Sequence, residues 1–286
     1  MSLDQPKAFV KHQSVTRDAF LGGRLTLSQP GRGFRAGLDS VLLGAAVAEG
    51  RKTLLDMGCG VGTAAFVAMA HNAGLAATLA DSNADMARLA EANAADNGFA
   101  GRTKVVITDI AGKGADRRAA GLVDNVYDSV IANPPFFADG TLANDPGRAG
   151  ARHMNAAALD LWIKTAAGAA CAGGEVIFIY PAQSLAPLLA GFVRRFGAVT
   201  VLPLSPRPDE PASRVLLRGI KGSRAPLTLL ASRALHEAEG RAFRPEFDAI
   251  FRGLARLVWE SARTDPKSGP TQRGSRMQTM TFEDRS

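Results

Sequence analysis

Short apolar runs alternate with longer amphipathic stretches through most of the chain. The strand-like runs lie at residues 53–57, 75–81, 104–108, 127–132 and 175–180. The stretches with apolar residues at helical spacing lie at residues 62–72, 84–98, 155–174 and 184–196. Strands that are almost wholly apolar are typical of parallel sheets with helices on both faces. The pattern therefore predicts an α/β fold with a mostly parallel sheet.

The pattern changes toward the C-terminal end. Residues 198–204 and 213–222 are strand-like, and the loop between them contains three prolines and no helical pattern. Two strands joined in this way predict a terminal antiparallel hairpin, which brings the expected sheet to seven strands. After about residue 261 the chain has few apolar residues and no periodicity, so we expect residues 261–286 to form a disordered tail.

The segment before the first strand is expected to form a small part of its own. It is rich in Gly and Arg, and it ends in an apolar stretch over residues 40–49 that predicts a helix with Asp39 as its N-cap. We therefore divide the chain into an N-terminal segment (1–50), a main domain (51–260) and a tail (261–286).

Composition excludes several classes of protein. The chain has 286 residues, of which 46% are hydrophobic, enough for a large core. No apolar run reaches about 18 residues and the N-terminus has no signal-peptide stretch, so we expect a cytoplasmic protein without a membrane span. Cys59 and Cys171 are the only cysteines, too few for a disulfide framework or a four-ligand zinc site, and we expect no bound metal.

The formal net charge of +7 is unevenly distributed. Residues 51–193 hold 11 Lys and Arg against 13 Asp and Glu, whereas residues 194–263 hold 13 against 7. A slightly acidic middle with a basic flank is what a domain with a polyanion-binding surface would have. A basic surface that is merely solvated gives the same counts, so charge alone does not distinguish the two interpretations.

A glycine-rich turn follows the first strand of the main domain. Gly58, Gly60 and Gly62 stand directly after that strand and before a helix. Glycine is needed in such a turn because the backbone bends sharply and a ligand has to approach it without a Cβ in the way. The spacing D-x-G-x-G-x-G differs from the G-x-G-x-x-G of dinucleotide-binding proteins, and no Gly-Lys-Ser/Thr follows, which excludes a P-loop.

Three successive strands are expected to end in an acid, at Asp56, Asp81 and Asp109. Asp81 is placed to accept both hydroxyl hydrogens of a ribose, and all three acids lie at the carboxyl edge, where open α/β sheets bind ligands. Each acid taken alone is also explained as a helix cap or a solvated loop residue. Together they would repel a diphosphate and favour a ligand with a ribose, an adenine and a positive centre. S-adenosylmethionine, with its cationic sulfonium, is such a ligand.

The fourth strand ends in Asn133, Pro134, Pro135 and Phe136 at the same edge. With this motif, the sequence resembles the class I S-adenosylmethionine-dependent methyltransferases, which have a Rossmann-like fold, over about residues 50–180. The motif is similar to the Asn/Asp-Pro-Pro-aromatic motif of enzymes that methylate exocyclic or amide nitrogens. The alternative is a turn in which the prolines merely end the strand and Phe136 packs into the core.

The resemblance implies a role for each residue of the motif. An exocyclic amino nitrogen shares its lone pair with the ring and is a poor nucleophile. The Asn133 side-chain oxygen and the Pro134 carbonyl can each accept one of its N–H groups, which directs the lone pair toward the methyl group. Phe136 can stack on the base, a contact worth about 1–3 kcal/mol in single-stranded nucleic-acid sites.

The expected cofactor contacts follow from the same resemblance. Gly58 and Gly60 are expected near the methionine part of S-adenosylmethionine, Asp81 at the ribose and Asp109 near the adenine. Asn133 is expected to contact the cofactor as well as the amine. Asp56 is expected to order the turn or a water molecule bound to the cofactor.

Other segments of the chain resemble a narrower family within this class of methyltransferases. Residues 27–47, 150–163, 214–222 and 235–253 look like the bacterial tRNA adenine-N6 methyltransferases that modify the anticodon loop of a valine tRNA, so the similarity covers about residues 20–254. It implies a tRNA substrate, an N-terminal segment that acts as a lid or contacts the substrate, and a role for Asp39 in closing the cofactor site. Related ribosomal-RNA enzymes carry similar segments, and the tail departs from the usual length of the family.

Basic residues are expected beside the catalytic edge. Arg148, Arg152 and His153 follow the motif on a loop, and Arg207 lies in the loop of the terminal hairpin. Arginines there can bind phosphates and make RNA binding depend on salt. An unpaired adenine in an RNA loop is also the easiest to extrude into a pocket. Capping or pairing with nearby acids is the alternative role for Arg152 and His153.

Three alternative functions remain open. Enzymes that methylate a glutamine amide in release factors share the motif, but they usually have a large helical N-terminal domain and a Tyr where this chain has Phe136. Guanine-N2 methylation of ribosomal RNA is closer, because it needs the same geometry at another exocyclic amine. A non-catalytic S-adenosylmethionine-binding module would not need Asn133 and both prolines. The sequence does not indicate an oligomeric state.

Overall fold

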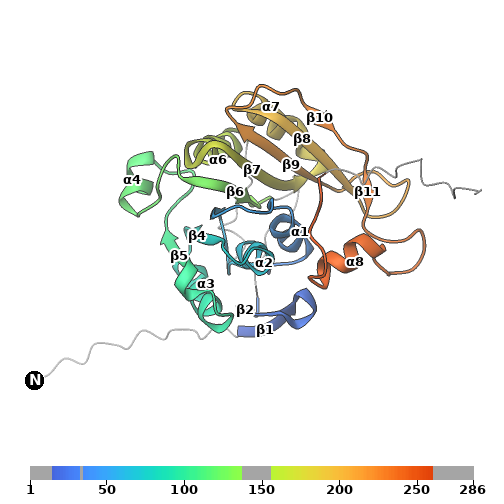
Figure 1. The fold of residues 1–286 in the computed structure, drawn as a ribbon, viewed down its shortest axis with the longest axis horizontal. Helices are drawn as coiled ribbons and strands as arrows, with labels where there is room; N and C mark the ends of the chain where they lie inside the picture. Colours follow the sequence, from blue (N-terminus) through green and yellow to red (C-terminus); the bar gives the residue numbers. More distant parts are fainter. Residues whose placement is uncertain (1–14, 33–34, 137–155, 260–286) are drawn as a thin grey trace, which may run out of the picture.

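The computed structural model describes residues 15–32, 35–136 and 156–259, which are arranged around a central sheet (Figure 1). Arg148, Arg152 and His153 lie outside the described residues, and so does the tail expected over residues 261–286.

The central sheet contains all seven strands expected from the sequence. In sheet order they are β5 (Thr103–Ile107), β4 (Ala76–Asp81), β3 (Thr53–Met57), β6 (Tyr127–Ala132), β7 (Ala170–Pro181), β9 (Arg214–Lys221) and β8 (Phe196–Ser205). All of them are parallel except β9, which runs antiparallel between β7 and β8. The predicted α/β fold, with a mostly parallel sheet and a terminal antiparallel hairpin, is therefore confirmed.

Two short strands extend the sheet beyond the prediction. β10 (Thr228–Leu229) and β11 (Arg233–Ala234) both pair in parallel with β8, so the sheet has nine strands among the described residues. Two residues are too few for the period-two alternation of a strand to be visible in the sequence. The chain then continues into α8 (Pro245–Phe251) at this end of the molecule (Figure 1).

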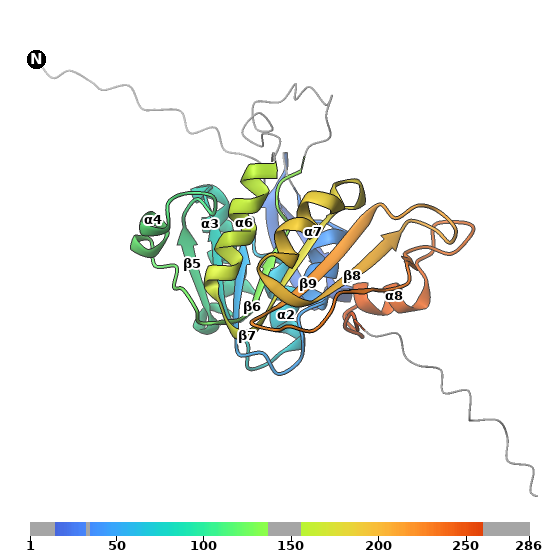
Figure 2. The ribbon, with the colours of Figure 1, turned by 90° about the horizontal axis from the view of Figure 1, so that it is seen from above.

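Both faces of the sheet are apolar and covered by helices. Neighbouring residues of a strand face opposite sides, and Leu54 and Leu55 of β3 are both fully buried, in two different core clusters. One face is covered by α1 (Leu38–Ala45), α2 (Thr63–His71), α3 (Ala84–Asp96) and α8, and the other by α6 (Ala156–Ala169) and α7 (Leu185–Val193) (Figure 2). A short helix, α4 (Gly114–Ala119), connects β5 to β6. Burial on both sides explains the nearly continuous apolar runs.

The helix expected over residues 155–174 is shorter than predicted. It ends at Ala169, and β7 begins at Ala170, which pairs with Tyr127 of β6. The alanines of this run favour a helix, but pairing with the neighbouring strand overrides that weak local preference.

The prediction that Asp39 is a helix N-cap is wrong. Gly37 occupies the N-cap of α1, and Asp39 lies within the first turn. An acid remains favourable there because the N-terminal end of a helix carries a partial positive charge.

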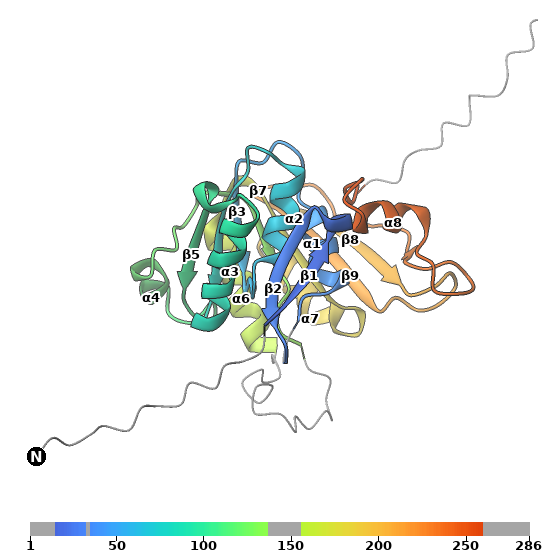
Figure 3. The same ribbon diagram turned by 90° about the horizontal axis from the view of Figure 1, so that it is seen from below.

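The N-terminal segment contains a β-hairpin that was not expected. β1 (Val15–Phe20) and β2 (Leu25–Pro30) are antiparallel and form a sheet of their own. Leu25 and Leu27 are buried in the core cluster beneath α2 and α3, and Thr26 between them is partly exposed. Figure 3 shows the hairpin lying beside these helices. The N-terminal segment is thus packed on the main domain.

Candidate active site

The carboxyl ends of the central strands meet at one edge of the sheet. Met57 of β3 is in register with Ala80 of β4 and with Ala132 of β6. The segments that follow these three strands therefore begin side by side. They are the glycine turn, the segment that starts at Ser82, and the segment that starts at Asn133.

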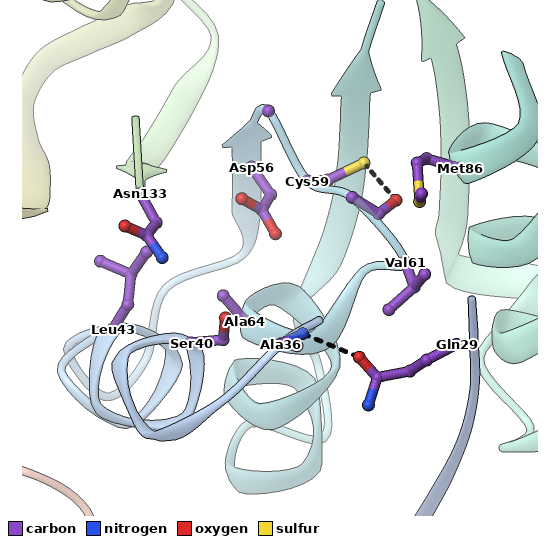
Figure 4. Close-up of a pocket in the computed structure, with 12 residues that line it drawn as sticks. Gln29, Ala36, Ser40, Leu43, Asp56, Cys59, Val61, Ala64, Met86 and Asn133 are labelled. Carbon is purple, nitrogen blue, oxygen red and sulfur yellow. Dashed lines mark hydrogen bonds between the residues drawn. The ribbon is translucent and has the colours of Figure 1, made fainter. Parts of the chain in front are cut away.

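A pocket lies at this edge (Figure 4). Its walls come from the N-terminal segment with α1, from the glycine turn with the start of α2, and from single residues of α3 and of the segment after β6. The lining residues are Gln29, Ala36, Ser40, Leu43, Asp56, Gly58, Cys59, Gly60, Val61, Ala64, Met86 and Asn133. The structure thus brings together four residues that the sequence singled out: Asp56, Gly58, Gly60 and Asn133.

The glycines of the turn meet different requirements. Their φ angles are positive, at 67° for Gly58, 54° for Gly60 and 89° for Gly62, which other residues adopt only with strain. A Cβ on Gly58 would lie 2.6 Å from the Trp162 ring of α6, so this glycine is needed for packing within the protein. A Cβ on Gly60 would meet no heavy atom within 4 Å. The backbone of Gly60 therefore faces open space that a ligand can enter.

Asp81, the last residue of β4, holds the glycine turn in place. One carboxylate oxygen accepts a hydrogen bond from the Gly60 N–H at 2.8 Å, and the other accepts one from the Asn83 N–H at 2.8 Å. A carboxylate offers about four acceptor positions, so acceptor capacity remains for the hydroxyl groups of a ribose. The ribose contact of Asp81 stays a prediction.

Asp56 is a buried acid in the wall of the pocket. It is 2% exposed, and its Oδ2 accepts a hydrogen bond from the Ala65 N–H at 3.2 Å, at the beginning of α2. Burial raises the pKa of Asp56 to about 7; the bond from Ala65 opposes the rise, and the charge of Asp81 adds to it. Asp56 therefore titrates near neutral pH, and a cation in the pocket would favour its charged form.

Asn133 follows β6 and projects its amide into the pocket, on the side of Leu43 and Asp56 (Figure 4). The next residue, Pro134, is buried and Pro135 is exposed. The motif is therefore anchored in the core at one proline, while the asparagine amide is directed at the space beside the glycine turn.

Phe136 packs edge to face on Tyr180 of β7, with the ring centroids 5.5 Å apart. Tyr180 is 2% exposed, and burial raises its pKa. Phe136 itself is only partly buried. The core packing named above as the alternative is thus present in part, and stacking of Phe136 on a base stays a prediction.

Three acids that were expected at the cofactor, Asp81, Asp109 and Asp39, are not among the residues that line the pocket. Asp81 is linked to the pocket through its hydrogen bond from Gly60. Asp109 is exposed two residues beyond the end of β5, and its side chain accepts a hydrogen bond from the Ala111 N–H at 2.9 Å. Asp39 forms an ion pair with Arg214 at 2.9 Å, which ties α1 to the start of β9. Each acid has a local structural role, and its contact with the cofactor stays a prediction.

Arg207 lies in the loop between β8 and β9, at the carboxyl edge. Its guanidinium donates hydrogen bonds to the carbonyls of Glu237 at 3.0 Å, Ala238 at 3.2 Å and Gly240 at 2.7 Å. It therefore holds two loops together. A contact with RNA, which stays a prediction, would compete with these bonds.

The other pocket residues were missed as site residues by the sequence analysis, among them Gln29, Ser40 and Met86. Gln29 of β2 is 1% exposed, and both ends of its amide are bonded. Its Nε2 donates to Asp18 at 2.6 Å, and its Oε1 accepts from the Ala36 N–H at 2.8 Å. The one sequence signal for Gln29 was its place in the segment 27–47, which contributes to the narrower family resemblance.

Other classes of site are not evident in the part of the chain that the structure describes. No group of three or more His, Cys, Asp and Glu is arranged to hold a metal ion there. No helix in the same ranges is long and apolar enough to cross a membrane. Cys59 and Cys171 are free thiols, and burial together with the charges of Asp56 and Asp81 raises the pKa of Cys59, which keeps its thiol protonated.

The strand order, the glycine turn after β3 and the Asn-Pro-Pro segment after β6 define a class I methyltransferase, whose cofactor is S-adenosylmethionine. The lining suits this cofactor, because Gly60 leaves open space and Asp56 supplies an acidic group in the wall for a cationic ligand. The chain belongs to the family described as methyltransferase small domain, whose sequence model matches residues 38–201.

Curated relatives confirm the narrower resemblance. The tRNA1(Val) (adenine(37)-N6)-methyltransferase of Parabacteroides distasonis is 27% identical over 219 residues, which are 76% of this chain and 88% of that protein. The protein of the same name from Porphyromonas gingivalis (strain ATCC 33277) is 30% identical over 177 residues, 60% of this chain and 68% of that protein.

Solved structures share the fold. A crystal structure from Agrobacterium tumefaciens, described as a predicted O-methyltransferase, has a TM-score of 0.65 and 32% identity, and covers 77% of this chain and 98% of that one. The T. thermophilus 16S rRNA N2 G1207 methyltransferase in complex with AdoMet and guanosine has a TM-score of 0.52 and 18% identity, and covers 76% of this chain and 53% of that one. This second likeness is evidence for the fold alone.

Proposed function

We propose that this methyltransferase modifies an exocyclic amine of RNA, and that the amine is the N6 of an adenine in a tRNA. The observation that carries the proposal is the position of Asn133. Its amide enters the pocket that the glycine turn lines, from the tip of the adjacent strand. The names of the curated relatives, which specify adenine N6 of a valine tRNA, support the choice of substrate.

The residues of the motif would activate the amine by holding its two N–H groups. S-adenosylmethionine supplies an electrophilic methyl group when it is bound. The Oδ1 of Asn133 accepts one N–H of the amine and the Pro134 carbonyl accepts the other, so that the nitrogen lone pair leaves the ring system and faces the pocket. The restricted φ of proline keeps that carbonyl in place. Positioning then supplies much of the rate of a direct displacement.

The substrate would be held on the outer side of the motif. Phe136 is fixed on Tyr180 by its edge-to-face contact and is partly exposed, which suits an aromatic residue that stacks on an extruded base. Arg148, Arg152 and His153 come soon after it in the chain and would bind the phosphates of the RNA loop.

The N-terminal segment 1–50 would serve as the lid of the site. Gln29 and Ala36 of this segment form one wall of the pocket, and the hydrogen bond between them fixes the chain that leads to α1. Closure of such a wall keeps water from the cofactor. We place the protein in the cytoplasm, together with its RNA substrate.

A transfer assay with three substrates tests the proposal. The protein is incubated with methyl-labelled S-adenosylmethionine and, in parallel, with unmodified tRNA, ribosomal RNA and a release factor, and the labelled pool is hydrolysed and analysed. Label in N6-methyladenosine from tRNA is the expected result. N2-methylguanosine from ribosomal RNA, methylglutamine from the release factor, or no transfer at all would each replace the proposal with one of the three alternatives.

A variant of Asn133 tests the mechanism. Asn133→Ala should lower the transfer rate by about 100-fold or more, as the loss of one preorganised hydrogen-bond partner does in other enzymes, while the Kd for S-adenosylmethionine changes only a few-fold. Asn125→Ala is the control, because Asn125 lies at the opposite edge of the sheet and accepts a bond from Lys221. A fully active Asn133→Ala enzyme would exclude the assigned role.

A further inference from the structure

The outer edge of β2 is hydrogen-bonded to two asparagine side chains of α3 and its C-terminal end. Asn97 accepts a bond from the Thr26 N–H at 3.0 Å and donates to the Thr26 carbonyl at 2.9 Å. Asn93 accepts from the Ser28 N–H at 2.7 Å and donates to the Ser28 carbonyl at 3.1 Å. The spacing of four residues on a helix and two on a strand brings the two pairs into line. The amides thus replace a third strand at the edge of the hairpin.

The two asparagines differ in their third hydrogen bond. The second N–H of the Asn97 amide bonds to the Asn93 carbonyl of its own helix at 2.8 Å. The second N–H of the Asn93 amide bonds to the Val61 carbonyl at 3.1 Å. Val61 stands between Gly60 and Gly62 in the glycine turn and lines the pocket. Asn93 therefore joins the hairpin directly to the turn against which the cofactor binds.

The position of Asn93 makes this link stiff. The residue is fully buried, with 0% exposure, so a bond that is lost there is not replaced by water. The turn is held by Asp81, by a bond from the Gly62 N–H to the Cys59 carbonyl at 2.9 Å, and by Asn93. Of these three restraints, only Asn93 is also bonded to the hairpin. On the hairpin side, Ser28 precedes Gln29, whose amide is part of the pocket wall. One side chain thus fixes two walls of the pocket relative to each other.

We propose that Asn93 is a positioning residue that couples the N-terminal hairpin to the glycine turn, so that cofactor affinity and hairpin order rise and fall together. The coupling is reciprocal by linkage, since a ligand that orders the turn must also order what the turn is bonded to. The inference concerns cofactor binding and does not depend on the RNA substrate proposed above.

Asn93→Ala and Asn97→Ala form a matched pair for the test. Each change removes one acceptor and two donor contacts, and two of the three bonds go to the same strand edge. Titration calorimetry without RNA, using S-adenosylmethionine and S-adenosylhomocysteine, measures the affinity of each variant. We expect Asn93→Ala to weaken both ligands by about tenfold, the size of one lost buried hydrogen bond. Asn97→Ala should stay within about twofold.

A merely structural role for both residues gives a different result. Both variants would then lower the unfolding midpoint, Asn93→Ala more because Asn93 is the more buried residue, and would change the affinity equally or not at all. An affinity change that is equal in the two variants, or absent from both, overturns the proposal.

Hydrogen exchange on the unmodified protein provides a test that does not depend on the folding of a variant. Addition of S-adenosylhomocysteine should slow the exchange of the Thr26 and Ser28 amides in the native protein. In each variant, the amide that keeps its acceptor is followed: Ser28 should still be protected in Asn97→Ala, whereas Thr26 should be unchanged in Asn93→Ala. If the ligand protects the glycine turn of the native protein but not the hairpin, the coupling does not exist.

Discussion

The affinity for S-adenosylmethionine should fall when the pH is lowered from about 8 to about 6, because Asp56 attracts a cationic ligand only when it is ionised. Burial in the pocket wall raises the pKa of Asp56 to about 7. Asp81 is the charged group that acts on it most closely, the Cys59 thiol is protonated, and Ser40 and Asn133 across the pocket are neutral. Proton and cofactor therefore compete through one carboxyl group.

The size of the effect follows from that pKa. With a pKa of about 7, roughly one tenth of the Asp56 carboxyl groups are ionised at pH 6 and nine tenths at pH 8. If binding requires the ionised form, the Kd at pH 6 is about tenfold higher than at pH 8.

The same titration acts on folding. The pKa of Asp56 is 3.8 in the unfolded chain and about 7 in the native protein, so the native state binds more protons between these two pH values. The free energy of unfolding therefore falls as the pH rises from 3.8 to about 7, by roughly 4 kcal/mol as an upper value.

Calorimetric binding across this pH range, for the native protein and for Asp56→Asn, measures the effect. Asparagine keeps an oxygen that can accept the bond from the Ala65 N–H but carries no charge. The Kd of the variant should therefore be high and independent of this titration, and the variant should unfold at a higher temperature than the native protein at pH 8. The amino group of the ligand titrates equally with both proteins and cancels in the comparison. Equal pH slopes for the two proteins would refute the reasoning.

Three further predictions concern single residues. Gly60→Ala should weaken S-adenosylmethionine binding in calorimetry by about tenfold or more, because the added Cβ fills ligand space at a positive φ. Gly58→Ala should mainly lower the unfolding midpoint, because its Cβ meets Trp162. The reverse pattern would contradict this division of roles. Phe136→Ala and Phe136→Leu should both raise the KM for tRNA by about tenfold in steady-state kinetics without changing cofactor affinity, and an unchanged KM would remove the stacking role. Arg207→Ala should speed hydrogen exchange in residues 237–240, whose carbonyls lose the Arg207 guanidinium as their hydrogen-bond donor. It should reduce the slope of the logarithm of the tRNA binding constant against the logarithm of the salt concentration by about 1 only if Arg207 also contacts a phosphate.

The sheet was predictable because each inner strand is buried on both faces. A strand such as β3 or β7 is then an apolar run that stands out from its surroundings, and the topology follows from the alternation with helices. The hairpin β1–β2 was missed because only Leu25 and Leu27 alternate with polar residues in β2, which is too short a run for a clear period of two, and because β1 contains two charged residues, Arg17 and Asp18. The pair of glycines in the turn between the two strands was the available clue.

The site divides in the same way. The meeting of Asp56, Gly60 and Asn133 at one pocket was predictable, because they lie at or just beyond the carboxyl ends of neighbouring parallel strands, which must meet. Gln29 and Asn93 were not, because their roles depend on how the hairpin packs on α3, and no local pattern encodes that contact. Local reasoning therefore finds the parts of a site that the sheet brings together and misses those brought by a separate element.

The structure also bears on the two interpretations of the basic flank. Most basic residues of this region are engaged within the protein, either with acids, with polar or carbonyl oxygens, or with an aromatic ring: Arg194, Arg195, Arg207, Arg214, Arg218, Lys221, Arg233, Arg252 and Arg256. Arg224, Arg241 and Arg244 form no ion pair with another described residue. Net charge by itself is therefore weak evidence for a polyanion surface here.

The positions of these three arginines determine which of them can bind RNA. Arg224 follows β9, which runs antiparallel, so it lies at the edge opposite the pocket. Arg241 and Arg244 follow β11, which is parallel to β8, and both are exposed at the edge where Asn133 lies. Exposed ion pairs elsewhere in the flank are worth only about 0–1 kcal/mol each, so an RNA phosphate could displace some of them at little cost. The case for an RNA substrate consequently depends on the asparagine in the pocket together with the names of the curated relatives, and only secondarily on the charge of the flank.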